Sequence, residues 1–326
     1  MIKNRKIWLF LAVFVLFAVI LPFIGAEKLD WRAIFARGGA GGPYARIFFQ
    51  LRLPRVWLGL LAGGALAMAG AALQVTFRNP LAEPWTLGMA GGAGLGAFVA
   101  RMCPGLWVEA GIVNTAQLLA LIGAGGALAL VLAVARRQGG GTTTMLLAGV
   151  TVGVISGGAI MAASGLVSPD KLAGFHRWLL GGLDAADWRA VGALALVAGP
   201  GVGVLAALAR EYNPLGLGEA MAAGQGVEVA RVRQWTAVGA GLAAAGVAAV
   251  AGPIGFVGLL APHAVRRVLG ADMRVVLPVS FLAGGCILAG CDALGRWAAA
   301  PVEVPVGALM ALAGGPVFLW LLARRR

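Results

Sequence analysis

Residues 234 to 265, QWTAVGAGLAAAGVAAVAGPIGFVGLLAPHAV, form a run of 32 residues without Asp, Glu, Lys or Arg. A helix needs about 20 apolar residues to cross a bilayer, so the run can hold one crossing or two. Ala251-Gly252-Pro253 interrupts it, and proline lacks the N–H that would continue a helix. The number of crossings in this run decides the topology of the whole chain.

The composition of the chain is that of a membrane protein. Of its 326 residues 60% are hydrophobic and 12% charged, and the mean hydropathy is +0.89, whereas a soluble domain carries roughly 25% charged residues. Lipid or other helices must therefore surround most of the chain. We predict an all-α, polytopic membrane protein in which residues 1–326 form a single transmembrane domain.

Long uncharged runs predict the membrane helices. There are nine, each near the length of a crossing: 7–26, 56–77, 84–100, 110–135, 138–169, 190–209, 234–265, 275–291 and 304–323. The first follows three basic residues, as in a signal peptide, but it is longer than the ~7 to 15 apolar residues of such a peptide. We interpret 7–26 as a retained first helix and 304–323 as the C-terminal helix, with a signal peptide as the alternative for 7–26.

Basic residues decide how often the run 234–265 crosses, because cytoplasmic loops are enriched in Lys and Arg. A single crossing would leave Arg266, Arg267, Arg274 and Arg324–Arg326 outside. A turn at Gly252-Pro253 returns all six to the cytoplasm and gives about ten helices with both termini cytoplasmic. The inner side then holds fifteen basic and five acidic residues, and the outer side eleven and eight.

The loops of this topology carry different charges. The outer loop 27–55 contains six basic residues, an exception to the charge bias that suggests an acidic partner or an anionic solute arriving from outside. Snorkelling at a helix start is the alternative for Arg52 and Arg55. The longest cytoplasmic connection is the loop 210–233.

The sequence offers no energy source of its own. A P-loop needs GxxxxGK[ST], and none of Lys3, Lys6, Lys28 and Lys171 stands in that context, so the chain has no nucleotide site and is not an enzyme. No ionisable residue lies in the middle of an uncharged run, and His263 and Asp292 lie near run ends, which disfavours an ion-coupled secondary transporter. Energy must come from another subunit.

Small and sulfur-containing residues suggest packing. Glycines recur every four residues, as at Gly59 and Gly63, Gly149, Gly153 and Gly157, or Gly199 and Gly203, and such faces allow close helix contact, with pore lining as the alternative. The three cysteines have no CxxC spacing and lie in or beside apolar runs. Neither a metal site nor a cofactor on this chain is predicted.

Three motifs are more specific than generic helix. The first runs from Arg52-Leu53-Pro54-Arg55 to Arg78-Asn79-Pro80-Leu81-Ala82-Glu83-Pro84, the second is Gly252–His263, and the third joins Glu303-Val304-Pro305-Val306-Gly307 to Gly314-Gly315-Pro316. Together, from about residue 50 to the C-terminus, they resemble the permeases of type II ABC importers. That family carries iron-siderophore complexes, haem and cobalamin.

The resemblance implies the partners and the location. It implies a homodimer of ten-helix subunits in a bacterial cytoplasmic (inner) membrane, enclosing one translocation pathway. Two ATP-binding cassette subunits, which would hold ATP and Mg, are expected below, and an extracytoplasmic substrate-binding protein above. No nucleic-acid partner is expected. The substrate, an iron chelate, haem or cobalamin, is not specified by the sequence.

The resemblance also assigns roles to particular residues. The segment Glu219–Gly224, EAMAAG, is similar to the EAA-type coupling segment that rests on the ATPase in this family. The matching residues are Glu219, Ala220 and Gly224. An ordinary polar loop is the alternative. Arg52 and Arg55 match arginines that dock the binding protein. Arg296 matches a third, with a lipid-facing anchor as the alternative. Six further residues are expected to have structural roles in the shared motifs: Asn79, Pro80, Gly252, Pro253, Pro262 and His263.

The chain has two histidines, and a histidine could contact haem. His176, in the stretch Phe175–Gly182 with Trp188, resembles a position on the family's short outer helix, and a solvated histidine is the alternative to a haem contact. His263 is interpreted as a structural residue of a Pro-His turn. Beside the importer, a secondary transporter and a structural membrane scaffold remain the rival functions.

Overall fold

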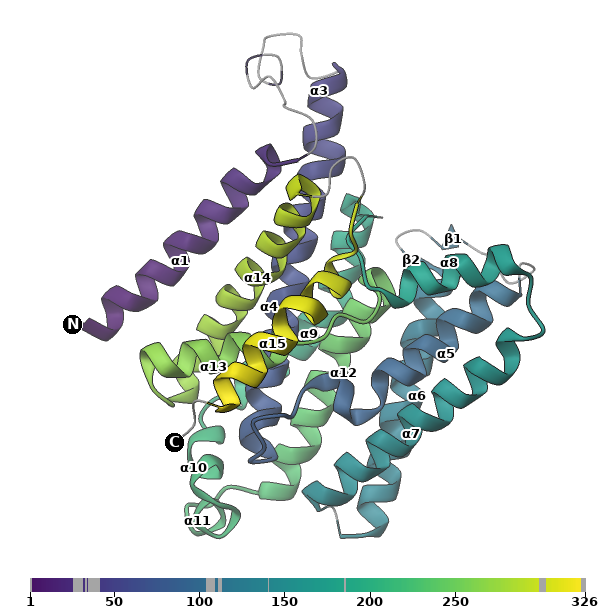
Figure 1. Ribbon diagram of the computed structural model, residues 1–326. Helices are drawn as coiled ribbons and strands as arrows, with labels where there is room; N and C mark the ends of the chain where they lie inside the picture. Colours follow the sequence, from purple (N-terminus) through teal and green to yellow (C-terminus); the bar gives the residue numbers. More distant parts are fainter. Residues whose placement is uncertain are drawn as a thin grey trace.

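The computed structural model describes residues 2–25, 32, 34, 42–103, 109–110, 113–139, 141–184, 186–298 and 303–323, and these form a bundle of helices (Figure 1). The N-terminal part contains α1 (Ile2–Ile20), the 3-10 turn η1 (Leu21–Phe23), α3 (Pro43–Arg46), the π-helical segment η3 (Ile47–Arg52), α4 (Leu53–Thr76), η4 (Pro84–Leu87) and α5 (Met89–Met102). The consecutive segments α3, η3 and α4 form one continuous helix from Pro43 to Thr76.

The middle of the chain contains β1 (Glu109–Ala110) and β2 (Val113–Asn114), which pair antiparallel, and then α6 (Thr115–Arg137), α7 (Thr142–Ser164), α8 (Pro169–Leu179) and α9 (Trp188–Ala207). The C-terminal part contains α10 (Tyr212–Leu217), α11 (Glu219–Gly224), α12 (Val229–Ala251), α13 (Val257–Leu269), α14 (Met273–Ala298) and α15 (Val306–Ala323). Apart from the two-residue strands, every one of these elements is helical, as the composition predicts.

Seven of the described helices are long and apolar enough to cross a membrane: those at Arg5–Phe23, Pro43–Thr76, Thr115–Arg137, Thr142–Ser164, Trp188–Ala207, Val229–Ala251 and Met273–Ala298. The helices α5, α13 and α15 occupy the remaining apolar stretches, and with 14, 13 and 18 residues each is shorter than any of the seven. The uncharged runs therefore predict where the helices lie. Helix length alone does not give the number of times that the chain crosses the membrane.

The run 234–265 divides where Gly252 and Pro253 predict a turn. The helix α12 ends at Ala251, Gly252 adopts φ +71°, and α13 begins at Val257. A Cβ on Gly252 would lie 2.3 Å from the carbonyl oxygen of Trp178, so both the backbone conformation and the close contact require glycine here.

Two details differ from the expectations. The predicted outer loop 27–55 is helical from Pro43 onward, because charged residues such as Arg46 do not end a helix and a proline at its first turn favours its start. The pair Pro262-His263 lies inside α13 and not in a turn, so that interpretation of His263 was wrong. Residues 26–31, most of 33–41 and 324–326 lie outside the described residues.

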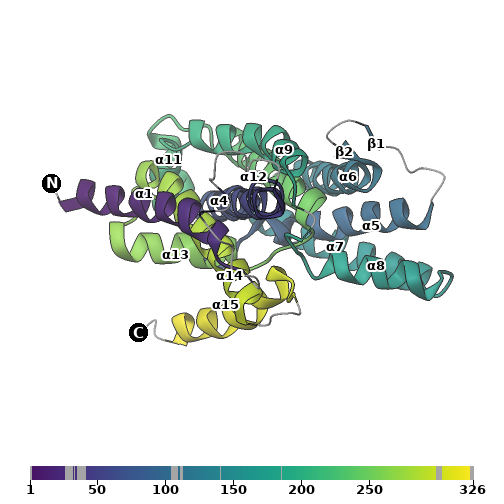
Figure 2. The same ribbon diagram turned by 90° about the horizontal axis from the view of Figure 1, so that it is seen from above.

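The helix α4 forms the centre of the bundle. It packs against α14, α12, α13 and α9, and Figure 2 shows it surrounded by other helices. A Cβ added to Gly63 would lie 2.3 Å from the carbonyl oxygen of Gly284, and one added to Gly70 2.1 Å from that of Gly258. The glycines of α4 thus set the close approach of α14 and α13, as small-xxx-small packing predicts.

Not every glycine repeat serves packing. Gly157, Gly199 and Gly203 have no atom within 4 Å of an added Cβ, whereas Gly149 lies against the backbone of Thr86 and Leu87, and Gly153 lies against Gly91 of α5. Parts of α7 and α9 therefore present small residues outward, away from the rest of this subunit.

Side-chain contacts define the two ends of the bundle. At one end Lys6, at the start of α1, donates to the carbonyl of Val268 in α13 at 3.1 Å, and Asn213 of α10 donates to Asp272 at 3.0 Å. At the other end Arg296 of α14 donates to the carbonyl of Ile24, which follows α1, at 3.1 Å. The start of α1 therefore lies on the same side as α10, and Figure 1 shows the C-terminus of α15 toward that side as well.

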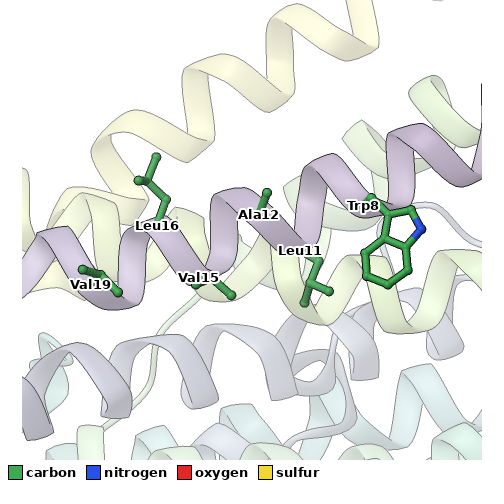
Figure 3. Close-up of a pocket in the computed structure, with 6 residues that line it drawn as sticks. All are labelled: Trp8, Leu11, Ala12, Val15, Leu16 and Val19. Carbon is green, nitrogen blue, oxygen red and sulfur yellow. The ribbon is translucent and has the colours of Figure 1, made fainter.

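The outward face of α1 is apolar. Trp8, Leu11, Ala12, Val15, Leu16 and Val19 line a shallow groove along this single helix (Figure 3). All six side chains come from one helix and none is charged, so the groove has the character of a lipid-facing surface and not of a solute site.

Candidate functional site

A cluster of charged residues connects α4 to α14 at the end of the bundle opposite α10. Arg55 donates from Nη2 and Nε to the carboxylate of Asp292 at 2.9 and 3.0 Å, and from Nη1 to Glu303 at 2.8 Å. Arg296 donates from Nε to Oδ2 of Asp292 at 3.0 Å, the same oxygen that Arg55 Nε contacts. Asp292 is only 3% exposed and binds both arginines, so its charge is fully compensated within the chain.

Arg52 belongs to the same region, where its guanidinium donates to the carbonyl of Phe23 at 3.4 Å. Arg52 and Arg296 are 8% and 7% exposed, and the Arg55 side chain is 12% exposed. The structure therefore brings the three predicted docking arginines together, but it holds their side chains against the protein. A cluster of three arginines and two carboxylates keeps a net positive charge at this end.

The connection between α9 and α12 forms a helical hairpin at the other end of the bundle (Figure 1). The helix α11 coincides with the predicted EAMAAG segment, Glu219–Gly224. Glu219 accepts a 2.5 Å hydrogen bond from Arg233 of α12, whose side chain is 9% exposed. This ion pair fixes the first turn of α11 on α12.

The preceding helix α10 is attached just as firmly. Tyr212 is buried and shares a 2.9 Å hydrogen bond with Thr236 of α12. Asn213 donates to Asp272 and accepts from the N–H of Met273 at 2.8 Å, which joins α10 to the start of α14. Hydrogen bonds therefore join the hairpin to both α12 and α14.

The outer surface of α11 is small and exposed. Ala220 and Gly224 are exposed, Met221 is 54% exposed, and a Cβ on Gly224 would meet no atom within 4 Å. Nothing in the described part of this subunit requires these small residues. Small side chains with one exposed methionine are suited to contact with another chain.

The segment between α4 and α5 packs against the break between α12 and α13. Trp85 donates from its indole N–H to the carbonyl of Ile254 at 2.7 Å, and Glu83 accepts a hydrogen bond from the N–H of Phe256. Phe256 has φ +68°, a conformation that is uncommon for a residue other than glycine. Burial raises the pKa of Glu83 to about 7, and the Phe256 hydrogen bond partly opposes this.

Asn79 and Pro80 form the turn after α4, as the Asn-Pro pair predicts. The Asn79 side chain accepts from the N–H of Leu81 at 2.9 Å, and Arg78 before it has φ +46°. Side-chain acceptors of this kind replace the helical hydrogen bonds that proline ends.

The stretch Phe175–Gly182 begins in the last turns of α8, whereas Trp188 is the first residue of α9 and donates from its indole N–H to the carbonyl of Phe49 at 2.9 Å. His176 is exposed, whereas Trp178 stacks on the buried Phe175 with ring centroids 6.0 Å apart. Among the residues that the structure describes, no group of three His, Cys, Asp or Glu side chains is placed to hold a metal ion.

The sequence shows Asp292 and Glu303 at the end of an apolar run and in a motif, but not that both bind Arg55. Arg55 lies 237 residues before Asp292 and 248 before Glu303. Arg233, the partner of Glu219, was not singled out at all. The only sequence signal for such a partner is the charge of the residue, because a carboxylate that is buried at the end of an apolar run needs a cation beside it.

Comparison with known proteins gives consistent results. The model of the FecCD transport family matches residues 10–324. The hemin transport system permease protein of Yersinia pestis is 33% identical over 303 residues, 93% of this chain and 90% of the relative. The vitamin B12 import system permease protein of Escherichia coli is 36% identical over 328 residues, 99% of this chain and 97% of the relative.

A third relative and a solved structure are also similar to this chain. The cobalamin import system permease protein of Halobacterium salinarum is 41% identical over 276 residues, 84% of this chain and 73% of the relative. A structure described as an inward-facing conformation of a metal-chelate type ABC transporter superposes with a TM-score of 0.86 at 26% identity and covers 99% of both chains.

Proposed function

Because the chain belongs to the FecCD transport family, we propose that it lines the pathway by which an ATP-binding-cassette importer brings haem, cobalamin or another metal chelate into the cell. The chain is the permease subunit of such an importer, and a separate partner hydrolyses ATP. A secondary transporter is not favoured. A bacterial inner-membrane location is consistent with the family.

The exposed helix α11 carries the mechanistic part of the proposal. Its small, outward surface would rest on the ATPase subunit, while the Glu219–Arg233 ion pair and the α10 contacts join it to α12 and α14. Movement of the ATPase pair on binding ATP would then tilt these helices and switch the pathway between inward-open and outward-open states.

We further propose ten crossings with both termini cytoplasmic. The helices α5, α13 and α15 add three to the seven long apolar helices. The contact of Lys6 with Val268 supports a cytoplasmic N-terminus, because it joins the start of α1 to the basic end of α13. A reporter enzyme that is active only outside the cytoplasm should be inactive when fused after residue 326 and active when inserted after residue 105.

Two copies of the chain would enclose the pathway. The outward face of α7 exposes Val154 (69%) and Ile155 (64%), and Gly157 on the same helix has open space beside it. Such a face needs either lipid or a second subunit. Disulfide formation between copies that carry a single introduced cysteine at Val154 would distinguish the two environments.

The arginine cluster is the proposed contact for the binding protein. Arg52, Arg55 and Arg296 leave a net positive charge that would attract glutamates on the binding protein, mainly by steering and orientation. Gln in place of both Arg52 and Arg55 should weaken docking at low salt, with thermal stability measured alongside because Arg55 also binds Asp292. Unchanged affinity at low salt would remove this role.

The test of the whole proposal is reconstitution. Liposomes that contain the chain, its ATPase and the binding protein should take up haem, cobalamin or an iron-siderophore only with ATP inside, and vanadate should stop uptake while an uncoupler should not. Uptake without ATP would contradict it. Exchanging the binding protein identifies the substrate, since selectivity would lie mainly there.

A further inference from the structure

A cavity of about 740 Å³ lies beside the hairpin, between the last turn of α9, the start of α10 and the first two turns of α12. Its size is within the ~300 to 1,000 Å³ typical of ligand pockets. Its ionisable lining residues are Arg210, Glu211, Glu228 and Arg231. It is separate from the exposed surface of α11 and from the arginine cluster at the opposite end.

The charges in this cavity balance. Two arginines and two glutamates face it, in contrast to the positive character of the chain as a whole. The Glu211 oxygen Oε2 is shielded from solvent and accepts no hydrogen bond from any residue that the structure describes. An unmade hydrogen bond on a carboxylate is costly, so a ligand donor in the cavity toward which the Glu211 carboxylate turns would gain affinity.

The apolar part of the cavity leads to a membrane-facing surface. Val204 and Leu208 of α9 line it, and Trp235 of α12 lies beside them with 47% of its surface exposed. Two turns before Val204 on the same stripe of α9, Leu196 is 64% exposed. Tryptophan and arginine together at the end of apolar helices are typical of the membrane interface.

We propose that this cavity binds the headgroup of a zwitterionic phospholipid with a primary ammonium, that is, phosphatidylethanolamine, in the cytoplasmic leaflet. The ammonium donates to Glu211, the phosphate accepts from Arg210 and Arg231, and an acyl chain follows Leu208 and Leu196 along α9. An anionic lipid brings no ammonium to offset the two carboxylates, and a choline headgroup has no N–H to donate. The placement in the cytoplasmic leaflet depends on the proposed topology.

Native mass spectrometry of the delipidated permease–ATPase complex tests the proposal with palmitoyl-oleoyl lipids that differ only in headgroup. The wild type should bind phosphatidylethanolamine about tenfold more tightly than phosphatidylcholine or phosphatidylglycerol, as a charge-assisted hydrogen bond predicts. Glu211→Gln should abolish the preference. Asp170→Asn, an exposed carboxylate on α8 at the far end of the bundle, should retain it.

A second variant protects the result against a local folding defect at Glu211. Arg231→Gln changes an exposed side chain and should weaken phosphatidylethanolamine and phosphatidylcholine alike, because both carry the phosphate. Equal affinity of the wild type for the two lipids, or a preference that survives Glu211→Gln, would overturn the proposal. So would lipid binding to the permease alone that disappears when the ATPase is present, since the cavity would then be a protein contact. None of these outcomes changes the expected ATP-driven uptake.

Discussion

Gln74 of α4 donates a 2.9 Å hydrogen bond to the backbone carbonyl of Gly258, the carbonyl that Pro262 leaves without its usual helical donor. Proline at position 262 has no N–H for the residue four positions earlier, and the side chain of another helix supplies the missing donor. The Gln74 carbonyl oxygen in turn accepts from Arg266. One amide therefore connects the centre of the bundle to successive turns of α13.

Replacing Gln74 by Leu should lower the free energy of unfolding by about 1 to 3 kcal/mol, because the buried Gly258 carbonyl loses its donor. Pro262→Ala restores a backbone N–H and should make the same Gln74→Leu change cheaper. Thermal unfolding of the purified single and double variants measures this coupling as a double-mutant cycle. Costs that simply add within about 0.5 kcal/mol would show that the two residues are independent.

The close approach of α4 and α14 gives a second prediction. Gly63→Ala would place a Cβ 2.3 Å from the Gly284 carbonyl oxygen, so the helices must separate and stability should fall by about 1 to 3 kcal/mol. Gly199→Ala on α9 is the matched control, since its Cβ meets no atom within 4 Å and alanine favours the helix by about 1 kcal/mol. Equal losses for both variants would contradict the packing argument.

The positions of the helices could be predicted from the sequence because they depend on residues that are close together in the chain. Uncharged runs and the Gly252-Pro253 break depend only on neighbouring residues, and the structure has helices in all nine runs and a break at Gly252. The extension of α4 back to Pro43 was missed, because a charged residue ends an apolar run but need not end a helix.

The sites were less predictable because their partners are distant along the chain. Arg55 was recognised as a surface contact, but its pairing with Asp292 depends on how α4 packs against α14. The pair Pro262-His263 was interpreted as a turn, whereas α13 continues through it, and the Gln74 contact shows how the helix accommodates the proline.

The pH dependence of stability should change when Glu83 is replaced. Its pKa rises from 4.5 to about 7 in the folded chain, so the folded state holds the proton more tightly than the unfolded state. Stability from this group is therefore greatest at low pH, falls between pH 4.5 and about 7, and is constant above, with a total change of about 3 kcal/mol at most.

Glu83→Gln should remove this dependence, so its stability relative to the wild type should increase as the pH rises from 5 to 8. Thermal unfolding of both proteins across this range isolates the contribution of Glu83 from that of other carboxylates. Asp170→Asn, which alters an exposed carboxylate, should run parallel to the wild type. A constant difference between Glu83→Gln and the wild type would mean that Glu83 stays ionised throughout.

The ion pair at the base of α11 gives the prediction closest to function. Glu219→Ala removes the 2.5 Å contact with Arg233, so α11 would move without pulling α12. Reconstituted with the ATPase and binding protein, this variant should lose about fivefold or more of its ATP-driven uptake, as expected for one charge-assisted hydrogen bond, while ATP hydrolysis continues. Gln225→Ala, an exposed neutral residue just after α11, should transport normally. If hydrolysis and uptake fall together, Glu219 instead supports assembly with the ATPase, and if neither falls, α11 transmits force through α10 and its contacts with Thr236 and Met273 alone.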